Sequence, residues 1–199
     1  MTNQNVRDSH SRWEIFYDED DAPIGLLYRR WSSRELLTDI IFASPERHRI
    51  TCRIELEGRR WVRSRYIEDG AEPVVVEAVE LIEEEDAIPT DMEYFLLNDA
   101  IANASADDEH TVSYHVFAPN DRHAIAQDAS IWSPQDGIWE IEANGELASS
   151  HTVVDGEIVS SDWRGVRSRP VPARQAVDQL RGIVDDDVLD TLLATDPVD

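Results

Sequence analysis

Two dipeptides in the second half of the chain, Asn144-Gly145 and Asp155-Gly156, stand between segments in which apolar and polar residues alternate. Asn-Gly and Asp-Gly are the strongest short signals of two-residue β-hairpins, because they tolerate the positive φ angles that such turns require. With the turn at 133–137 and the alternating residues 111–117, they predict an antiparallel meander of four or five strands ending near Arg164. Any fold of this chain must accommodate that sheet.

The first half also consists largely of segments that alternate with the period of a β-strand. Strands are expected at 13–17, 24–31, 36–43, 48–57 and 59–66, with Glu57-Gly58 as a hairpin turn and Ser44-Pro45 as another. Residues 72–82 begin as a strand and then become ambiguous between strand and helix. Residues 105–109 are predicted to form an acidic loop.

Helical spacing appears in three short stretches. Thr90 follows Pro89 and precedes Glu93 by three residues, which is a capping-box pattern that predicts a helix to about Asn103. From Pro172 onward, apolar residues recur at helical spacing, and the acidic run 185–187 offers an N-cap for a last helix at 188–194.

These elements predict an α+β fold that is mainly β: a strongly curved antiparallel sheet or incomplete β-barrel, with one central helix over its mouth and two short C-terminal helices. We expect a disordered N-terminus at 1–12, a β-rich domain at 13–170 with its helix at about 90–103, and a helical segment at 171–199 packed on that domain. As an architecture, this order resembles the half-barrel carriers of lipids and lipoproteins, although no sequence motif carries the resemblance.

The composition is strongly acidic, with a formal net charge of −24, and all 18 of its basic residues are arginine. This balance favours adaptation to high salt, where screening limits self-repulsion, and disfavours nucleic acid or a membrane surface as partner. The single Cys52 lies on the apolar side of its strand, so a packed thiol in a reducing cytoplasm is expected. Neither a signal peptide nor a membrane-spanning helix is recognised, and we predict a cytoplasmic location.

Seven of the 18 arginines lie in the hairpin 47–66. A simple register places Arg49 and Arg53 near Arg63 and Arg65, with Trp61 among them, and guanidinium groups beside an indole can hold an anion. We predict a ligand site from the five residues Arg49, Arg53, Trp61, Arg63 and Arg65. The alternative is that the protein's own carboxylates pair with these arginines on a solvated face.

Other combinations of residues point less directly to chemistry. The usual nucleotide, metalloprotease, hydrolase and thiol motifs are absent from the sequence. His115, His123 and His151 can share a metal only if folding brings them together, so neither a metal nor a cofactor is predicted. His151 and Glu140 form a candidate acid–base pair, while Trp31 and Trp61, beside arginines, are candidate ligand contacts.

Three functions follow in order of preference. The first is a non-catalytic carrier that holds a small anionic amphipathic or aromatic ligand in a β-cavity. The second is a hydrolase of a phosphate or acyl ester that uses the same cavity. The third is a protein-interaction module that uses the arginine-rich hairpin. The sequence favours the non-enzymatic readings and leaves the oligomeric state open.

Overall fold

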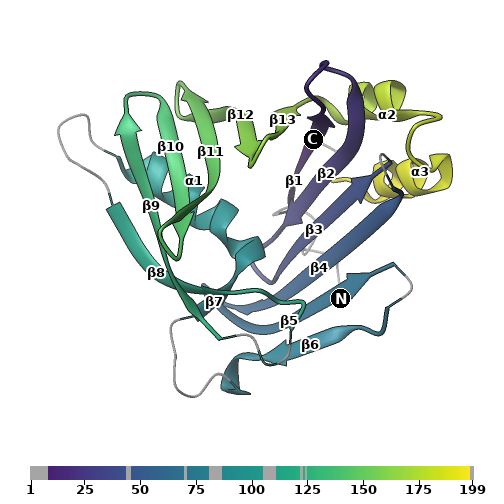
Figure 1. Cartoon of the computed structure of the whole chain (residues 1–199). Coiled ribbons are helices and arrows are strands. Elements are labelled where there is room, and N and C mark those ends of the chain that lie inside the picture. The colour runs from purple at the N-terminus through teal and green to yellow at the C-terminus, as the bar shows by residue number, and fades with distance from the viewer. Residues whose placement is uncertain are drawn as a thin grey trace.

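A computed structural model describes residues 9–43, 46–69, 71–80, 87–104, 111–121, 123 and 125–197. In this part of the chain, thirteen strands form one sheet in the order β6-β5-β4-β3-β2-β1-β13-β12-β11-β10-β9-β8-β7. The sheet curls strongly without joining its two edges (Figure 1). Every neighbouring pair is antiparallel except β7 and β8. The predicted mainly-β, curved and unclosed fold is confirmed.

Six strands from the first half of the chain form one arm of the sheet: β1 (His10–Tyr17), β2 (Pro23–Trp31), β3 (Glu35–Phe42), β4 (His48–Glu57), β5 (Arg60–Glu68) and β6 (Val74–Glu77). The other arm consists of β7 (Ala87–Pro89), β8 (Thr111–Phe117), β9 (Gln127–Gln135), β10 (Ile138–Ala143), β11 (Glu146–Val154), β12 (Glu157–Trp163) and β13 (Val166–Pro170). Two 3-10 turns, η1 (Ala78–Glu80) and η2 (Thr90–Met92), and three helices, α1 (Glu93–Asn103), α2 (Ala173–Leu180) and α3 (Asp186–Thr195), complete the described elements.

The predicted hairpin turns form where the sequence requires positive φ. Asn144 and Gly145 have φ angles of 55° and 75°, and Asp155 and Gly156 have 53° and 80°. A third turn of the same kind, at Arg164-Gly165, falls where we expected the meander to end. It adds β13, which pairs with β1 and so joins the two arms of the sheet.

The C-terminal helices cover the convex side of the sheet at β1, β2 and β3 (Figure 1). Val177, Leu180 and Leu189 from these helices pack on alternate residues of the strands, including Trp13 and Leu26. Since the opposite face of the same strands faces the concave side, these strands are buried on both faces. Asp185 caps α3 as predicted, because its side chain accepts a hydrogen bond from the Asp187 amide at 2.9 Å.

Helix α1 lies inside the curve of the sheet (Figure 1). It packs Tyr94, Leu97 and Ala100 against Ile131, Trp139, Ile141 and Ile158 of the second arm. The predicted helix near 90–103 is therefore present, but the capping box is wrong, because the turn η2 that precedes α1 has no side-chain cap. The two acidic residues of that pattern, Asp91 and Glu93, face the concave cavity instead.

The described strand pairs contain five register shifts, and those in β5 and β12 change faces that simple alternation would assign. Leu56 pairs with Trp61 and Glu55 with Arg63, so Val62 is an extra residue in β5. Trp61 consequently points to the buried concave side with Cys52, whereas Arg63 points to solvent. The expectation that Trp61 shares a face with Arg63 and Arg65 is wrong for this reason.

A second bulge lies in β12, where Val153 pairs with Ile158 and Thr152 with Ser160, so that Val159 is the extra residue. Ile158 and Ser161 are buried, while Val159 is exposed. Because of this bulge, Trp163 does not share a side with Val159. Trp163 lines the concave cavity.

The first strand begins at His10 rather than Trp13, so residues 10–12 belong to β1 and not to a disordered N-terminus, whereas residues 1–8 lie outside the described part of the chain. The turn at 44–45, the ambiguous residues 81–82 and the acidic loop 105–109 lie outside the described residues. None of the described helices combines the length and the apolar character that a membrane crossing requires.

Trp61 also links the two ends of the open sheet. Its indole nitrogen donates a 2.8 Å hydrogen bond to the carbonyl of Ala87 in β7, although β5 and β7 lie near opposite ends of the strand order. Its ring packs on Phe117 of β8, with the centroids 5.3 Å apart. One side chain therefore spans the seam that backbone pairing leaves open.

We expect Trp61→Phe to lower the free energy of unfolding by about 2–3 kcal/mol, because it removes the buried bond and leaves the Ala87 carbonyl without that donor. Denaturant titration measures this change. The matched control is Trp132→Phe, since the buried indole nitrogen of Trp132 has no hydrogen-bond partner in the described structure. Equal losses in the two variants would contradict the role of the bond.

Candidate ligand cavity on the concave face

The concave side of the sheet contains a cavity of about 400 Å³, a volume in the range of small-molecule sites. Strands β1 to β5 form one wall, and the start of α1, residues 118–120 and strands β10 to β13 form the rest. Most of the lining is apolar, and five aromatic side chains contribute to it: Phe16, Phe42, Tyr66, Tyr94 and Trp163. The cavity accommodates a compact, mainly apolar molecule.

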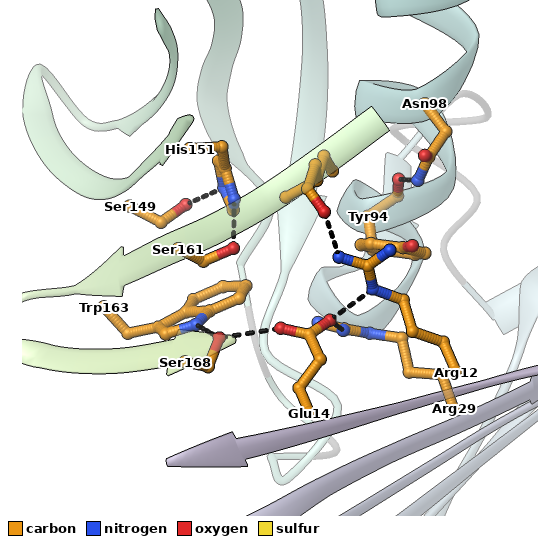
Figure 2. Close-up of polar contacts among 11 residues, drawn as sticks. Arg12, Glu14, Arg29, Tyr94, Asn98, Ser149, His151, Ser161, Trp163 and Ser168 are labelled. Carbon is orange, nitrogen blue, oxygen red and sulfur yellow. Dashed lines mark hydrogen bonds and ion pairs between the residues drawn. The ribbon is translucent and has the colours of Figure 1, made fainter. Parts of the chain in front are cut away.

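A buried ion network adjoins one end of this cavity (Figure 2). The carboxylate of Glu14 accepts hydrogen bonds from Arg12 Nε at 2.8 Å, Arg29 Nη1 at 2.7 Å and Ser168 Oγ at 2.7 Å. Trp163 Nε1 donates to the same serine oxygen at 3.1 Å. The network thus ties β1 to β2, β12 and β13.

Glu14 is ionised in this setting. Burial by itself would raise the pKa of its carboxyl group, but the positive charges of Arg29 and Arg12, together with the Ser168 hydrogen bond, bring the pKa below its usual value. Arg29 is only 5% exposed, and its guanidinium lies 4.1 Å from the centre of the Tyr94 ring. Two guanidiniums against one carboxylate leave one positive charge in excess beside the cavity.

His151 is buried in the cavity wall between two serines (Figure 2). Its Nε2 is 2.8 Å from Ser149 Oγ, and its Nδ1 is 2.8 Å from Ser161 Oγ. Burial, with the nearby charge of Arg29, lowers the pKa of the imidazole to about 4. The ring is therefore neutral near neutral pH and acts as a hydrogen-bonded part of the wall.

Asp91, in the turn before α1, places a carboxyl group in the same cavity. Burial raises its pKa, while hydrogen bonds from Cys52 and Thr38 and the charge of Arg29 oppose that rise. Burial also raises the pKa of the Cys52 thiol, which stays protonated and makes a 3.8 Å contact with Ser64 Oγ. The packed thiol expected from the sequence is what the structure contains.

Glu93 contributes a second carboxyl group, on the first turn of α1. It accepts a 2.7 Å hydrogen bond from the hydroxyl of Tyr114. Burial raises the pKa of Glu93 to about 7, and the charge of Asp91 adds to that rise. The ionisation of Glu93 therefore changes the charge of the cavity near neutral pH.

The five residues predicted for the ligand site do not gather around this cavity. Arg49 pairs with Asp39 at 3.0 Å, Arg53 with Glu35 at 3.4 Å, and Arg63 with Glu77 at 2.7 Å and Glu55 at 3.6 Å. Arg53, Arg63 and Arg65 are exposed, whereas Trp61 is buried on the other face. Arg49, Arg53 and Arg63 therefore pair with the protein's own carboxylates, as the alternative interpretation predicted. An anion site on that outer face stays a prediction, and Trp61 is no part of it.

The other sequence candidates also separate. His151 lies opposite Trp139, and Glu140 lies opposite the next residue along, Ser150. Neighbouring residues of a strand point to opposite faces, so Glu140 faces away from His151 and the suggested acid–base pair is wrong. His115 lies 3.2 Å from Asp128 on the outer surface. Among the described residues, no three potential ligands from His, Cys, Asp and Glu are grouped to hold a metal ion. Trp31 packs on Phe95 of α1, with the ring centroids 5.6 Å apart.

Sequence reasoning missed the residues that do meet in the cavity. Glu14 stands between the apolar residues Trp13 and Ile15, and Arg29 follows the apolar run 24–28, and a charge placed in or beside such a run is the available signal of a buried ion pair. Asp91 and Glu93 were assigned to a helix start, which hid their position in the cavity. The partners of Asp91 and Glu93 come from β2, β3, β4 and β8, and only the folded sheet brings these strands together.

Comparison with known proteins adds little beyond the fold. No protein-family model matches the chain, and no curated protein matches it. Among solved structures, it is similar to the crystal structure of a beta-barrel-like protein of a domain of unknown function, DUF1849, from Brucella abortus. The two are 8% identical, the match covers 82% of this chain and 94% of that chain, and the TM-score is 0.33. The similarity concerns the fold alone, and no functional argument rests on it.

We expect Glu93→Gln to stabilise the protein increasingly as pH rises. The pKa of Glu93 is about 7 in the folded state and near 4.5 in the unfolded state, so the folded state holds the proton more tightly. The contribution of the protonated Glu93 to the free energy of unfolding is therefore complete below about pH 4.5 and is lost as pH rises through about 7. The neutral amide avoids this loss, so the variant should gain up to about 3 kcal/mol relative to the parent between about pH 5 and about pH 8.

Denaturant titrations across this pH range measure the effect. Asp99→Asn removes an exposed carboxyl group from the same helix and serves as the control. A pH-independent difference for Glu93→Gln would show that this carboxyl is already ionised in the folded protein.

Proposed function

We propose that the protein is a non-catalytic binding protein that holds a small amphipathic or aromatic molecule in the concave cavity. The apolar body of the ligand lies among the aromatic side chains, and its anionic group lies toward Arg29. The single observation that carries this proposal is the combination in one cavity of a mainly apolar lining and a buried guanidinium. Sites of this kind use burial for affinity and a few polar groups for orientation.

The charge of the wall supports an anionic ligand group. Arg12 and Arg29 share the single carboxylate of Glu14, so one positive charge lacks a partner within that network. An anionic ligand group beside the buried Arg29 would add a favourable charge interaction at low solvent exposure. The ion network also holds Arg29 in place before any ligand arrives, which reduces the entropy lost on binding.

Two potential catalytic groups, His151 and Cys52, are in states that favour binding over ester hydrolysis, whereas Glu93, whose pKa is about 7, remains an acid–base candidate in the cavity. A general base works best when its pKa lies near the working pH, whereas the pKa of His151 is about 4. The Cys52 thiol is buried and its pKa is raised, so it lacks the thiolate character of a nucleophile. These groups suit a packed and hydrogen-bonded cavity wall.

Filling the cavity should abolish binding. We expect naphthalene-2-sulfonate, an aromatic monoanion, to bind the parent protein, and we expect Ile40→Trp to weaken binding by at least about tenfold, because the indole occupies ligand space. Titration calorimetry measures both affinities. Circular dichroism confirms that the variant is folded.

The matched control is Val154→Trp, which adds the same indole at an exposed position and should leave the affinity unchanged. Naphthalene-2-methanol has the same ring and a neutral group, and should bind more weakly than the sulfonate. Absence of sulfonate binding to the parent protein, or binding unaffected by Ile40→Trp, would contradict the proposal. Equal affinity for the alcohol would contradict the anionic part of it.

A further inference from the structure

The cavity contains more ionisable groups than holding one anion requires. Beside Arg29 it contains Asp91 and Glu93, two carboxyl groups that come from neighbouring positions at the start of α1. In ionised form, both would repel an anionic ligand. If the cavity binds an anion beside Arg29, these carboxyl groups must be in a form that does not repel it.

We infer that a monoanionic ligand group is held between the guanidinium of Arg29 and the protonated carboxyl group of Asp91, so that binding takes up a proton. This inference rests on the proposed function, because it concerns the same cavity and the same ligand. A protonated carboxyl donates a hydrogen bond that a carboxylate cannot donate. Proton uptake therefore converts Asp91 from a repelling charge into a donor.

Burial of Asp91 favours its protonated form and is the largest influence on its pKa. Cys52 of β4, Thr38 of β3 and the positive charge of Arg29 of β2 act in the opposite direction, and the hydroxyl of Tyr66 from β5 lies within electrostatic reach. Glu93 adds a second acid from α1. Arg29 is thus the cation that faces Asp91, and its own ion pair with Glu14 limits how far it neutralises a second carboxylate.

The groups around Arg29 decide the charge of the ligand. Arg12 and Glu14 of β1 form its ion network, and His151 of β11 is neutral. One excess positive charge matches one negative charge on the ligand. A dianion such as phosphate would leave a second charge uncompensated beside two acids, so a carboxylate or sulfonate is the expected class.

The sign of the pH dependence follows from the coupled acids. Burial raises the pKa of both Asp91 and Glu93, and because that of Glu93 reaches about 7, Glu93 retains its proton at mildly acidic pH. A bound anion favours their protonated forms further. Affinity should be highest on the acidic side and should fall as pH rises through about 7, by up to about tenfold per pH unit for each proton taken up.

The test uses naphthalene-2-sulfonate, because its charge is constant and any proton uptake must come from the protein. Calorimetric titrations near neutral pH in phosphate and in Tris, buffers with different ionisation enthalpies, give the number of protons taken up per ligand. We expect about one proton for the parent protein, and at least about tenfold weaker binding at about pH 8.5 than at about pH 6.5.

Asp91→Asn keeps an uncharged side chain of the same size, so binding should persist with much smaller proton uptake and a flatter pH profile. Glu93→Gln is the second variant, and a partial reduction is expected there because the two acids are coupled. Asp99→Asn, on the exposed side of α1, should behave like the parent protein.

The outcomes separate the two proposals. If the sulfonate binds in the cavity with the same apparent enthalpy in both buffers, proton-linked binding is wrong and the proposed function stands. Unchanged proton uptake in Asp91→Asn would equally overturn the assignment to this residue. If the parent protein does not bind the sulfonate at all, the proposed function itself fails.

Discussion

Glu14 lies on β1, the strand at which the two arms of the sheet meet, and its carboxylate accepts hydrogen bonds from Arg12, Arg29 and Ser168. The charge is paired and hydrogen-bonded, which is the condition under which a protein interior tolerates it. Removing either arginine would leave the buried carboxylate of Glu14 with less compensating charge in an apolar environment, which is costly. The position of Arg29, and with it the polar end of the cavity, therefore depends on this carboxylate.

The helices allow a charged residue to be buried in the middle of a sheet. Because α2 and α3 cover the convex side of β1 to β3, apolar residues such as Ile15 and Leu26 form a core there. The concave side of the same strands is then available for Glu14 and Arg29 without loss of that core. If one face of these strands were solvated, only one face would be buried, and the strands could not contain both the apolar core and the buried ion pair.

The bulges in β5 and β12 each place an aromatic residue on the concave side. The extra Val62 turns Trp61 inward, where its indole bonds to β7 and links the open ends of the sheet. The extra Val159 leaves Ile158 and Trp163 on the inner side. Bulges bend the strand that contains them and increase its twist, so the same irregularities also suit a strongly curved sheet.

The sequence alone determined the kind of fold. Local signals are sufficient for hairpins such as Asn144-Gly145, for the helix after Pro89 and for the cap at Asp185, because each depends on residues that are near neighbours in the chain. They also indicate a packed thiol at Cys52. The curved, unclosed sheet with three helices follows from the order of these elements.

Only the tertiary structure decided which residues form the cavity. Simple alternation placed Trp61 among the arginines, and one extra residue in β5 reversed that, because strand faces depend on an unbroken period of two. The arginines of the hairpin pair with carboxylates on adjacent strands. In the cavity region, by contrast, Glu14 meets Ser168, and Arg29 lies near Asp91, across long sequence separations. Register and long-range pairing are properties of the assembled sheet, so no local pattern specifies them.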